Sequence, residues 1–287
     1  MKIIIAGATG FIGKNLLKYF SKKDNEIIAI YNKKMPSLLN TSNIKWVQVD
    51  LRNPNIIKEY LPNTDLFLQF AATTSGANDI KKRPFIHVTD NAVMNSYLLR
   101  EAFEAGVKHF IFPSCTVMLQ SREFQSEKDW NPNEEINENY YGVGNTKVYI
   151  EKMCKFYSGL GLKTTVIRHS NVFGPYDKFD LQKSHVLGAS VRKVLDANEG
   201  DIINVWGSGQ ARRDFIFISE LINFIEKAFC NQKELFGLFN CGMGYSISIN
   251  ELVKNIISIS KKNLEIKNDL SKPDIPTALS LDCNKAY

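Results

Sequence analysis

The stretch Gly7-Ala8-Thr9-Gly10-Phe11-Ile12-Gly13 decides the fold, because it joins an apolar run, Ile3-Ile4-Ile5-Ala6, to an amphipathic segment. A β-branched run, then glycines, then apolar residues at helical spacing predicts a strand, a tight turn and a helix. Glycines let such a turn bend sharply and approach a pyrophosphate without a Cβ in the way, and the helix N-terminus offers free N–H groups to phosphates. The stretch therefore predicts a dinucleotide-binding βα unit that contacts its cofactor through Gly7, Thr9, Gly10, Phe11, Ile12 and Gly13.

Composition narrows the class of protein. The chain has 287 residues, 44% hydrophobic and 23% charged, which is typical of a globular protein with a sizeable core. No apolar run is long enough for a membrane span, and residues 1–6 are too short for a signal peptide, so we expect a cytoplasmic protein without a membrane partner. The net charge of +6 comes from dispersed lysines, which indicates a solvated surface suited to anionic small ligands and not to nucleic acid.

The five cysteines are odd in number and scattered, without paired metal-ligand spacing. They indicate reduced thiols, and we expect no metal site and no disulfide framework.

Short apolar strands alternate with helices through the first half, at residues 26–30, 46–50, 65–70, 107–112 and 164–168. This alternation predicts a Rossmann-type α/β fold with a doubly wound parallel sheet, whose ligands bind at the carboxyl ends of the strands. We expect a dinucleotide-binding domain over residues 1–170 with a return segment at about 213–245. Residues 171–212 and 246–287 would form a smaller C-terminal substrate-binding lobe, and residues 121–138 a loop over the active-site edge.

The end of the second strand bears on the cofactor. A site for NAD places a carboxylate there for the ribose hydroxyls, whereas a site for NADP has positive charge for the extra phosphate. This chain has Tyr31-Asn32-Lys33-Lys34, with no acid, so we favour NADP(H) bound beside Asn32 and Lys33. The alternative is that the lysines belong only to a solvated turn.

Other strand ends supply further cofactor contacts. Ala71 and Ala72 are small enough for the diphosphate and ribose to lie against the backbone. Asp50, followed by Leu51, either accepts from the adenine amino group or caps the next helix. Asn91 lies within the long helix after Pro84, where it is a polar residue on a partly exposed face. That helix is expected to bury Val88, Val93, Leu98, Leu99 and Phe103.

Together these motifs resemble the extended short-chain dehydrogenase/reductase family, in its nucleotide-sugar branch. The resemblance covers nearly the whole chain and rests on residues 7–13, Ala71-Ala72, Asn91, Ser114, Lys147 with Glu151, and residues 168–175. The second half is most similar to the GDP-L-fucose synthases, through residues 174–179, 184–186 and 205–215. The resemblance implies epimerisation and NADPH-dependent C4 reduction of a nucleotide 4-keto-6-deoxy sugar, by a homodimer paired through the helices that carry Asn91 and Lys147.

The same resemblance implies a role for each site residue. Ser114 would bond the sugar C4 oxygen, and Lys147 would hold the nicotinamide ribose and lower the pKa of a catalytic tyrosine. His185 would carry protons at C3 and C5 with a cysteine, whose position is Thr116 here with Cys115 adjacent, which leaves epimerisation open. The remaining implied contacts are His169 and Asn171 to the cofactor, and Asn171, His185, Arg192, Trp206 and Arg213 to the substrate. For Arg213, beside a glycine turn, a surface ion pair is the alternative to diphosphate capture.

The catalytic tyrosine is where the chain departs from the family. The family places it four residues before the lysine, and this position is Val143. On a continuous helix Tyr140 would share a face with Lys147 but sit roughly 10 Å away, and Tyr141 would point elsewhere. Gly142 and Gly144 predict instead that the helix begins near Asn145, which leaves Tyr141 on a loop that curls back. We prefer Tyr141 to Tyr140 as the acid, and keep open that neither is catalytic.

Two classes of function follow. The first is an NADP-dependent nucleotide-sugar reductase or epimerase/reductase, or a cofactor-recycling NAD(P)-dependent 4-epimerase or dehydratase. The second is a nucleotide-binding regulator that has lost catalysis, which the valine at position 143 favours.

Overall fold

The computed structural model describes residues 1–286 except 34–41, 54–56, 75–82, 182–183 and 273–276. Seven parallel strands form the main sheet in the order β11-β6-β5-β4-β1-β2-β3. The strands are β1 (Lys2–Ala6), β2 (Glu26–Tyr31), β3 (Ile44–Gln48), β4 (Leu66–Gln69), β5 (His109–Pro113), β6 (Lys163–His169) and β11 (Phe236–Cys241). The order runs outward from β1 in both directions, which confirms the predicted doubly wound sheet and puts the ligand crevice beside β1 and β4.

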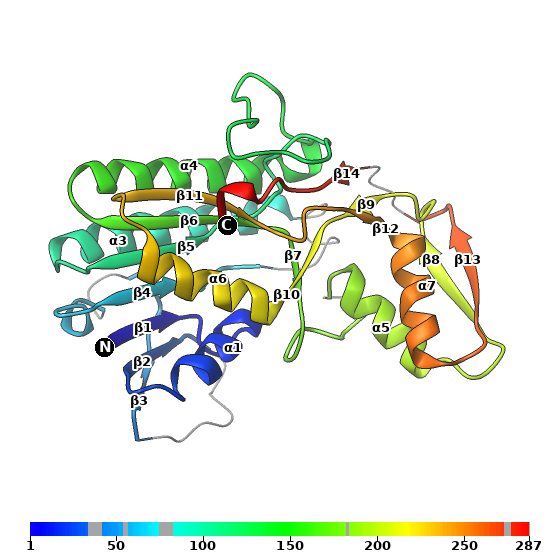
Figure 1. The fold of residues 1–287 in the computed structure, drawn as a ribbon, viewed down its shortest axis with the longest axis horizontal. Helices are drawn as coiled ribbons and strands as arrows, with labels where there is room; N and C mark the ends of the chain where they lie inside the picture. The colour runs from blue at the N-terminus through cyan, green and yellow to red at the C-terminus, as the bar shows by residue number, and fades with distance from the viewer. Residues whose placement is uncertain (34–41, 54–56, 75–82, 182–183, 273–276, 287) are drawn as a thin grey trace.

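Helices cover both faces of this sheet (Figure 1). α1 (Phe11–Phe20) and α6 (Ile218–Asn231) pack together on one face, and α3 (Thr89–Glu104) and α4 (Tyr141–Gly159) pack together on the other. Leu16, Leu17 and Phe20 of α1 are buried, as their spacing predicts. Each large apolar side chain buried in this way contributes about 1.5–3 kcal/mol, so the two apolar layers hold the strand ends at fixed positions.

A smaller part of the chain lies beyond the carboxyl ends of the strands, at the right of Figure 1. It contains α5 (Val186–Asp196), α7 (Ile249–Ser260) and the parallel pair β8 (Ile202–Trp206) and β13 (Glu265–Asp269) around an apolar cluster of their own. Short strands connect it to the main sheet: β7 (Asn171–Phe173), β9 (Arg212–Arg213), β10 (Phe215–Phe217), β12 (Ile247–Ser248) and β14 (Ala278–Leu279). The domain boundaries given above remain a prediction.

Three single-turn helices complete the part that bears on the site: η2 (Lys58–Tyr60), η3 (Pro84–His87) and η4 (Glu138–Tyr140). A fourth, η5 (Asn284–Ala286), follows Leu281 and Cys283, which are buried with Met118. η5 lies beside β11, so the end of the chain returns to the main sheet.

Some local expectations were wrong. β3 begins at Ile44 and β5 at His109, two residues from the predicted starts. Val93 and Phe103 are each 36% exposed, although their spacing predicted burial. The core-facing stripe of α3 runs instead through Met94, Leu98, Leu99 and Ala102.

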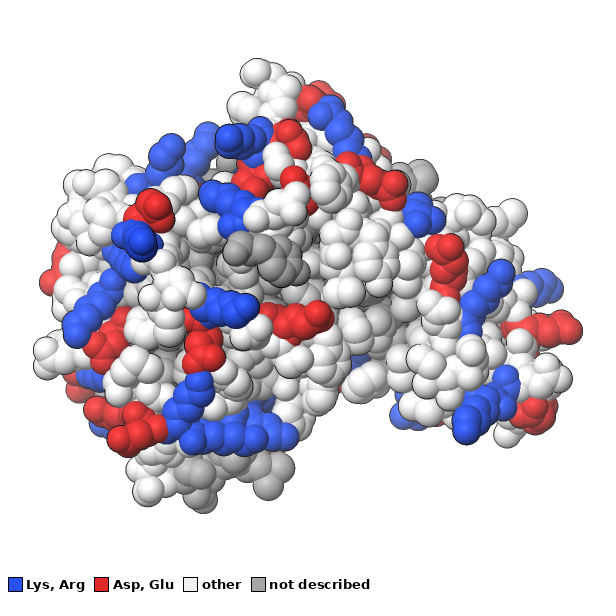
Figure 2. Space-filling view, viewed as in Figure 1, with Lys and Arg blue, Asp and Glu red and all other residues white. Residues whose placement is uncertain are grey.

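The surface carries both signs of charge. Figure 2 shows Lys and Arg interspersed with Asp and Glu over one face of the molecule, with neither sign forming a continuous field. Among the described helices, none combines the length and the apolar character that a bilayer span requires. All five cysteines are free thiols.

Candidate active site

The glycine turn between β1 and α1 is set by close backbone approach. Gly7 has a φ of +75°, and a Cβ there would lie 2.6 Å from the carbonyl oxygen of Phe70 at the end of β4. A Cβ on Gly13 would lie 2.1 Å from the carbonyl oxygen of Gly7. Only glycine fits either position, so the turn lies directly on the neighbouring strand end and α1 lies directly on the turn.

The N-terminus of α1 is open toward the same edge. Its N-cap is Gly10, which supplies no side-chain hydrogen bond, so the first N–H groups of the helix, at Phe11 and Ile12, have no partner within the helix. Ala71 and Ala72 follow β4 across the crevice, with Ala72 exposed. Small side chains opposite an uncapped helix N-terminus fit the diphosphate of a dinucleotide.

Charged side chains dominate the ends of β2 and β3. Asn32 and Lys33 are exposed after β2, and Lys34 lies outside the described residues. Asp50 accepts from Arg52, with the closest contact at 2.6 Å, and these hydrogen bonds lower the pKa of the Asp50 carboxyl to about 2. Arg52 also pairs with Asp90 of α3 at 3.2 Å. Asp50 was predicted either to accept from the adenine amino group or to cap the next helix. In either role its carboxylate also stays bonded to Arg52.

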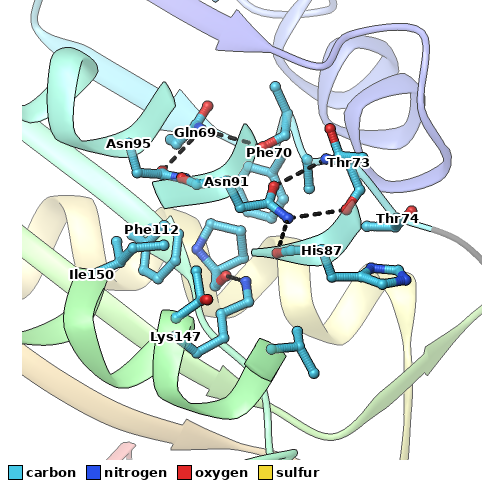
Figure 3. A pocket seen from close by; sticks show the side chains of 15 residues that line it. Gln69, Phe70, Thr73, Thr74, His87, Asn91, Asn95, Phe112, Lys147 and Ile150 are labelled. Atoms are coloured by element: carbon cyan, nitrogen blue, oxygen red, sulfur yellow. Dashed lines mark hydrogen bonds between the residues drawn. The ribbon is translucent and has the colours of Figure 1, made fainter. Parts of the chain in front are cut away.

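A cavity opens where β4, β5, η3, α3 and α4 meet, and Asn91 holds its wall (Figure 3). The Asn91 side chain accepts from the Thr73 N–H and donates to the carbonyl oxygens of Thr73 and His87, at 2.8–3.0 Å. Asn91 is only 9% exposed, so its interpretation as a polar residue on a partly exposed face was wrong. These hydrogen bonds hold the segment after β4, at Thr73, against η3.

Gln69 and Asn95 extend this polar layer, although neither was predicted as a site residue. The Gln69 amide donates to Asn95 at 3.0 Å and to the Ala71 carbonyl at 3.2 Å. The signal was present, because Asn91 and Asn95 are one helical turn apart on the face of α3 that packs on the sheet. Asparagines at that spacing on a buried face indicate a hydrogen-bonded structural layer.

Lys147 extends from α4 into the cavity, toward the end of β5 (Figure 3). Its Nζ donates to the Pro113 carbonyl oxygen at 2.9 Å and lies 4.7 Å from the centre of the Phe112 ring. Burial lowers the pKa of Lys147 below its ordinary value. The ammonium is thus held at the carboxyl end of β5, next to the crevice that the sheet order identifies.

α4 begins at Tyr141, so the predicted start near Asn145 was wrong. Asn145 lies within the helix and donates to the Tyr141 carbonyl at 2.8 Å. The two glycines are tolerated because this turn is closely packed: a Cβ on Gly142 would lie 3.0 Å from Val88, and one on Gly144 would lie 2.9 Å from Ile136.

Because α4 is continuous from Tyr141, its helical spacing determines which side chains before Lys147 face the cavity. Val143, one turn before it, lines the cavity wall. Tyr141 is 62% exposed and six residues away, about 240° around the helix. Tyr140 packs beside the buried cluster that contains Met118. The structure therefore does not bring Tyr141 to Lys147, and valine occupies the position of the family's tyrosine.

Ser114 lies behind the cavity in a buried network. Its hydroxyl donates to Glu151 of α4 at 2.5 Å, and Glu151 pairs with Arg168 of β6 at 2.7 Å. Ser114 is 0% exposed, and Glu151 and Arg168 are 6% and 2% exposed. This network connects the end of β5 with α4 and β6. The Ser114 hydroxyl donates its hydrogen to the Glu151 carboxylate.

Cys115 lies two residues after the end of β5, and His169 is the last residue of the adjacent strand β6. Burial raises the pKa of the half-buried Cys115 thiol, and the nearby charge of Lys147 opposes that rise. Burial lowers the pKa of His169 to about 4, and the charges of Lys147 and His185 add to this effect. His169 is therefore neutral at pH 7, with its Nδ1 at 2.8 Å from the Ser170 carbonyl oxygen.

The remaining predicted substrate residues come from the connecting strands and the smaller part of the chain. Asn171 donates to the Asp214 carbonyl at 2.9 Å. His185 is the exposed N-cap of α5, and Arg192 pairs with Asp196 on the exposed side of that helix. Trp206 of β8 is 54% exposed, and Arg213 of β9 bonds Thr277. Among the described residues, no cluster of three His, Cys, Asp or Glu could hold a metal ion.

The motifs match a known family model, described as the NAD dependent epimerase/dehydratase family, over residues 3–242. The chain belongs to this family. The predicted resemblance to extended short-chain dehydrogenases/reductases is thereby confirmed, and the member described here belongs to a class of enzymes dependent on a nicotinamide dinucleotide.

Family members with related sequences include two synthases. GDP-L-colitose synthase of Yersinia pseudotuberculosis is 27% identical over 280 residues, covering 95% of this chain and 86% of the relative. GDP-L-fucose synthase of Sinorhizobium fredii is 27% identical over 287 residues, covering 95% and 84%.

Two solved structures share the fold of this chain. UDP-glucose 4-epimerase of Thermotoga maritima, solved with UDP-glucose, superposes with a TM-score of 0.83 at 23% identity, covering 100% of this chain and 91% of that chain. MoeE5 in complex with UDP-glucuronic acid and NAD gives a TM-score of 0.83 at 19% identity, with the same coverage.

Proposed function

We propose that this chain is an NADP-dependent nucleotide-sugar reductase or epimerase/reductase that acts at C4 of a nucleotide 4-keto-6-deoxy sugar. The observation that carries the proposal is the position of Lys147, held by the Pro113 carbonyl in a cavity between the ends of β4 and β5. The similarity to GDP-L-colitose and GDP-L-fucose synthases over 95% of the chain supports the choice of sugar class.

Each part of the site has a role in this proposal. The uncapped N-terminus of α1 binds the cofactor diphosphate, and Lys147 binds the nicotinamide ribose. A reduced nicotinamide, when bound, supplies the hydride for C4. His185 binds the nucleotide sugar from the lobe formed by residues 171–212 and 246–287, where Trp206 offers an exposed aromatic surface, and Arg213 binds it from β9 at the edge of that lobe.

The end of β2 supports NADP over NAD. No acid follows the strand, and Lys33 is exposed there as a cation for a 2′-phosphate. A solved structure with NAD bound shares only the fold, at 19% identity. The preference for NADP over NAD therefore rests on the residues of this chain. Titration with NADPH and NADH should give at least tenfold tighter binding of NADPH, and Lys33→Glu should remove the difference.

The test of the proposal is NADPH consumption by the purified chain against GDP-, CDP- and dTDP-4-keto-6-deoxy sugars. We expect one sugar to drive oxidation and Lys147→Met to abolish it. Conversion of a nucleotide sugar without net NADPH oxidation, with NAD retained through purification, would identify a cofactor-recycling 4-epimerase or dehydratase instead.

A second candidate function is a nucleotide-binding regulator. The observation that favours it is Val143, which puts an apolar side chain one turn before Lys147. NADPH binding without turnover of any sugar in the panel would support it.

We also propose a homodimer formed through α3 and α4. Both helices expose large apolar side chains: Phe156 is 55% exposed, Tyr149 41%, and Val93 and Phe103 36% each, and Leu160 directly after α4 is 51% exposed. The helices pack side by side, and Tyr149 bonds Ser96 across them at 2.9 Å, so these residues belong to one surface. An apolar surface on two adjacent helices fits a second copy of itself.

Phe156→Glu should convert the dimer to a monomer, because it buries a charge in the contact. Light scattering after size exclusion measures the change. Ile259→Glu, on α7 and 81% exposed, is the matched control and should leave the mass unchanged. A wild-type chain that is monomeric at 10 µM would contradict the proposal.

A further inference from the structure

The reduction proposed above needs a proton for the C4 oxygen, and few side chains around the cavity can supply one. Val143 lies one turn before Lys147 and has no acidic hydrogen. The Ser114 hydroxyl donates to the Glu151 carboxylate behind the cavity. Neither the position of the family's tyrosine nor the serine after β5 therefore offers a proton to the substrate.

The other polar side chains of the cavity wall are also unsuited to this step. The Thr73 hydroxyl donates to a carboxylate of α3 at 3.2 Å, and the Thr146 hydroxyl donates to the Gly142 carbonyl oxygen at 2.8 Å. A general acid works best with a pKa near the operating pH, and alcohols and amides lie far above it. Among the described residues that line the cavity, the titratable side chains are Lys147 and His87.

Lys147 and His87 lie on different walls of the cavity (Figure 3). Lys147 extends from α4, and its Nζ donates to the Pro113 carbonyl oxygen at 2.9 Å. The His87 ring lies beside Thr74, on the side of η3. The bond to Pro113 holds the ammonium at the carboxyl end of β5, where a parallel sheet binds its ligands. Lys147 is therefore the titratable group held where the substrate is expected.

We infer that the Lys147 ammonium is itself the proton donor to the C4 oxygen, in place of the tyrosine that α4 lacks. The inference rests on the proposed function. It differs from the role that the resemblance implies, in which the lysine holds the ribose and acts on a tyrosine. An ammonium has three hydrogens, so one bonds the Pro113 carbonyl and two remain, for a ribose hydroxyl and for the C4 oxygen.

In this step the C4 carbonyl carbon accepts the hydride from the reduced nicotinamide. The carbonyl oxygen takes a proton from Lys147 Nζ, so that the ketone becomes an alcohol and the ammonium a neutral amine. A proton from solvent then restores the ammonium. The sugar gains a hydride and a proton, the cofactor loses the hydride, and one proton is consumed from water.

The surroundings of Lys147 set the pH dependence of this step. Burial is the largest influence and lowers the pKa of Lys147, while the neighbouring thiols and carboxylate oppose that fall. The titratable groups around it are Glu151 and Cys154 of α4, Cys115 after β5, His169 of β6 and His87 of η3. An acid works only while it is protonated. The kcat should therefore fall as the pH rises through the pKa of Lys147, at a lower pH than an ordinary lysine gives.

The first test is Lys147→Arg in NADPH oxidation with the sugar that the wild type reduces. A guanidinium keeps the positive charge and the N–H donors but does not give up a proton. Lys147→Arg should therefore lower kcat about 10²–10⁴-fold, the range of general acid catalysis, and remove the alkaline limb, with NADPH affinity within about threefold. Lys155 is an exposed lysine of α4, so Lys155→Arg is the matched control and should be unchanged.

A second variant, Lys147→Arg combined with Val143→Tyr, separates a lost acid from lost geometry. A phenol one turn before the cation should recover about tenfold or more of the lost kcat and introduce a new pH limb. A Lys147→Arg chain with wild-type kcat would overturn the inference, as would a kcat loss that this tyrosine does not recover and that comes with an equal loss of NADPH affinity. Both outcomes leave the proposed reductase standing, whereas that function fails if no sugar drives NADPH oxidation by the wild type.

A measurement without turnover follows the proton on Lys147. Trace acetylation with acetic anhydride across a pH series, read by mass spectrometry, reports when each lysine loses its proton, because only the neutral amine reacts. The midpoint for Lys147 should lie below that of the exposed lysines, and saturating NADPH should slow its reaction and leave theirs unchanged. A midpoint at or above that of the exposed lysines, or labelling that ignores NADPH, would overturn the inference whether or not a sugar is reduced.

Discussion

The first turns of α1 and α4 both face the carboxyl edge of the sheet, but they build their parts of the site in different ways. The α1 turn acts through backbone: Gly7 and Gly13 allow contacts that a Cβ would block, and N–H groups face the crevice. The start of α4 acts through side chains, and its first two turns present Val143 and Lys147 to the cavity.

A site made by backbone groups and a site made by side chains therefore depend on the sequence in different ways. A site made by the backbone requires positions without a Cβ. A few glycines between a strand and a helix meet this requirement, so the local sequence specifies the site. A side-chain site depends on the residue at which the helix begins, because a shift of two residues turns a side chain by about 200°. α4 begins at Tyr141, and this start alone removes Tyr141 from the cavity.

The largest expected effect is at the α1 turn. Gly13→Val should lower the free energy of unfolding by more than about 3 kcal/mol and abolish NADPH binding, because its Cβ would lie 2.1 Å from the Gly7 carbonyl oxygen. Urea denaturation and fluorescence titration measure the two effects. Gly159→Ala, at the end of α4 with no atom within 4 Å of its Cβ, should be neutral or slightly stabilising. Equal effects would show that the α1 turn is not a special backbone site.

Next comes the network behind α4. Glu151→Gln should lower the free energy of unfolding by about 3–5 kcal/mol, because it leaves the buried Arg168 guanidinium without its carboxylate. The control is Glu226→Gln, whose partner Lys23 is 41% exposed, with an expected loss below about 1 kcal/mol. Urea denaturation distinguishes them, and a surface-sized loss for Glu151→Gln would mean that α4 is held mainly by its apolar packing.

A smaller effect is expected at the adenosine end of the crevice. Arg52 lowers the pKa of Asp50 to about 2, so the pair stabilises the fold above the unfolded carboxyl pKa, and this stabilisation disappears as the pH falls through about 2. Both side chains are more than one-third exposed, so solvent screening limits Asp50→Asn to a loss below about 1 kcal/mol at pH 7. Denaturation at pH 7 and pH 2 should show the difference only at pH 7. A difference that persists at pH 2 would exclude the ion pair as its cause.

The smallest effect is expected at Tyr141. Tyr141→Phe should change kcat for NADPH oxidation by less than twofold, because the side chain is 62% exposed and does not line the cavity. Steady-state kinetics measures this kcat, and Lys147→Met, which should abolish oxidation, is measured in parallel for comparison. A tenfold loss in Tyr141→Phe would mean that the first turn of α4 unwinds when substrate binds.

Much of the fold could be predicted from local pattern. The glycine turn and the alternating strands and helices of the first half follow from spacing that depends on neighbouring residues. Burial was wrongly predicted for Val93 and Phe103 because periodicity identifies an apolar face but not what covers that face. Asn91 was misjudged because a buried polar side chain is recognisable only through its hydrogen-bond partners, which lie on β4 and η3.

By itself, the sequence determined the dinucleotide turn and the alternation of strands and helices that predicts the parallel doubly wound sheet, because each depends on residues a few positions apart. Only the tertiary structure decided that α4 starts at Tyr141, that the Ser114 hydroxyl donates to Glu151, and that Pro113 of β5 pairs with Ile167 of β6. These depend on how α4 packs against η3 and how β5 registers with β6. Such contacts join residues far apart in the chain, and no local pattern encodes them.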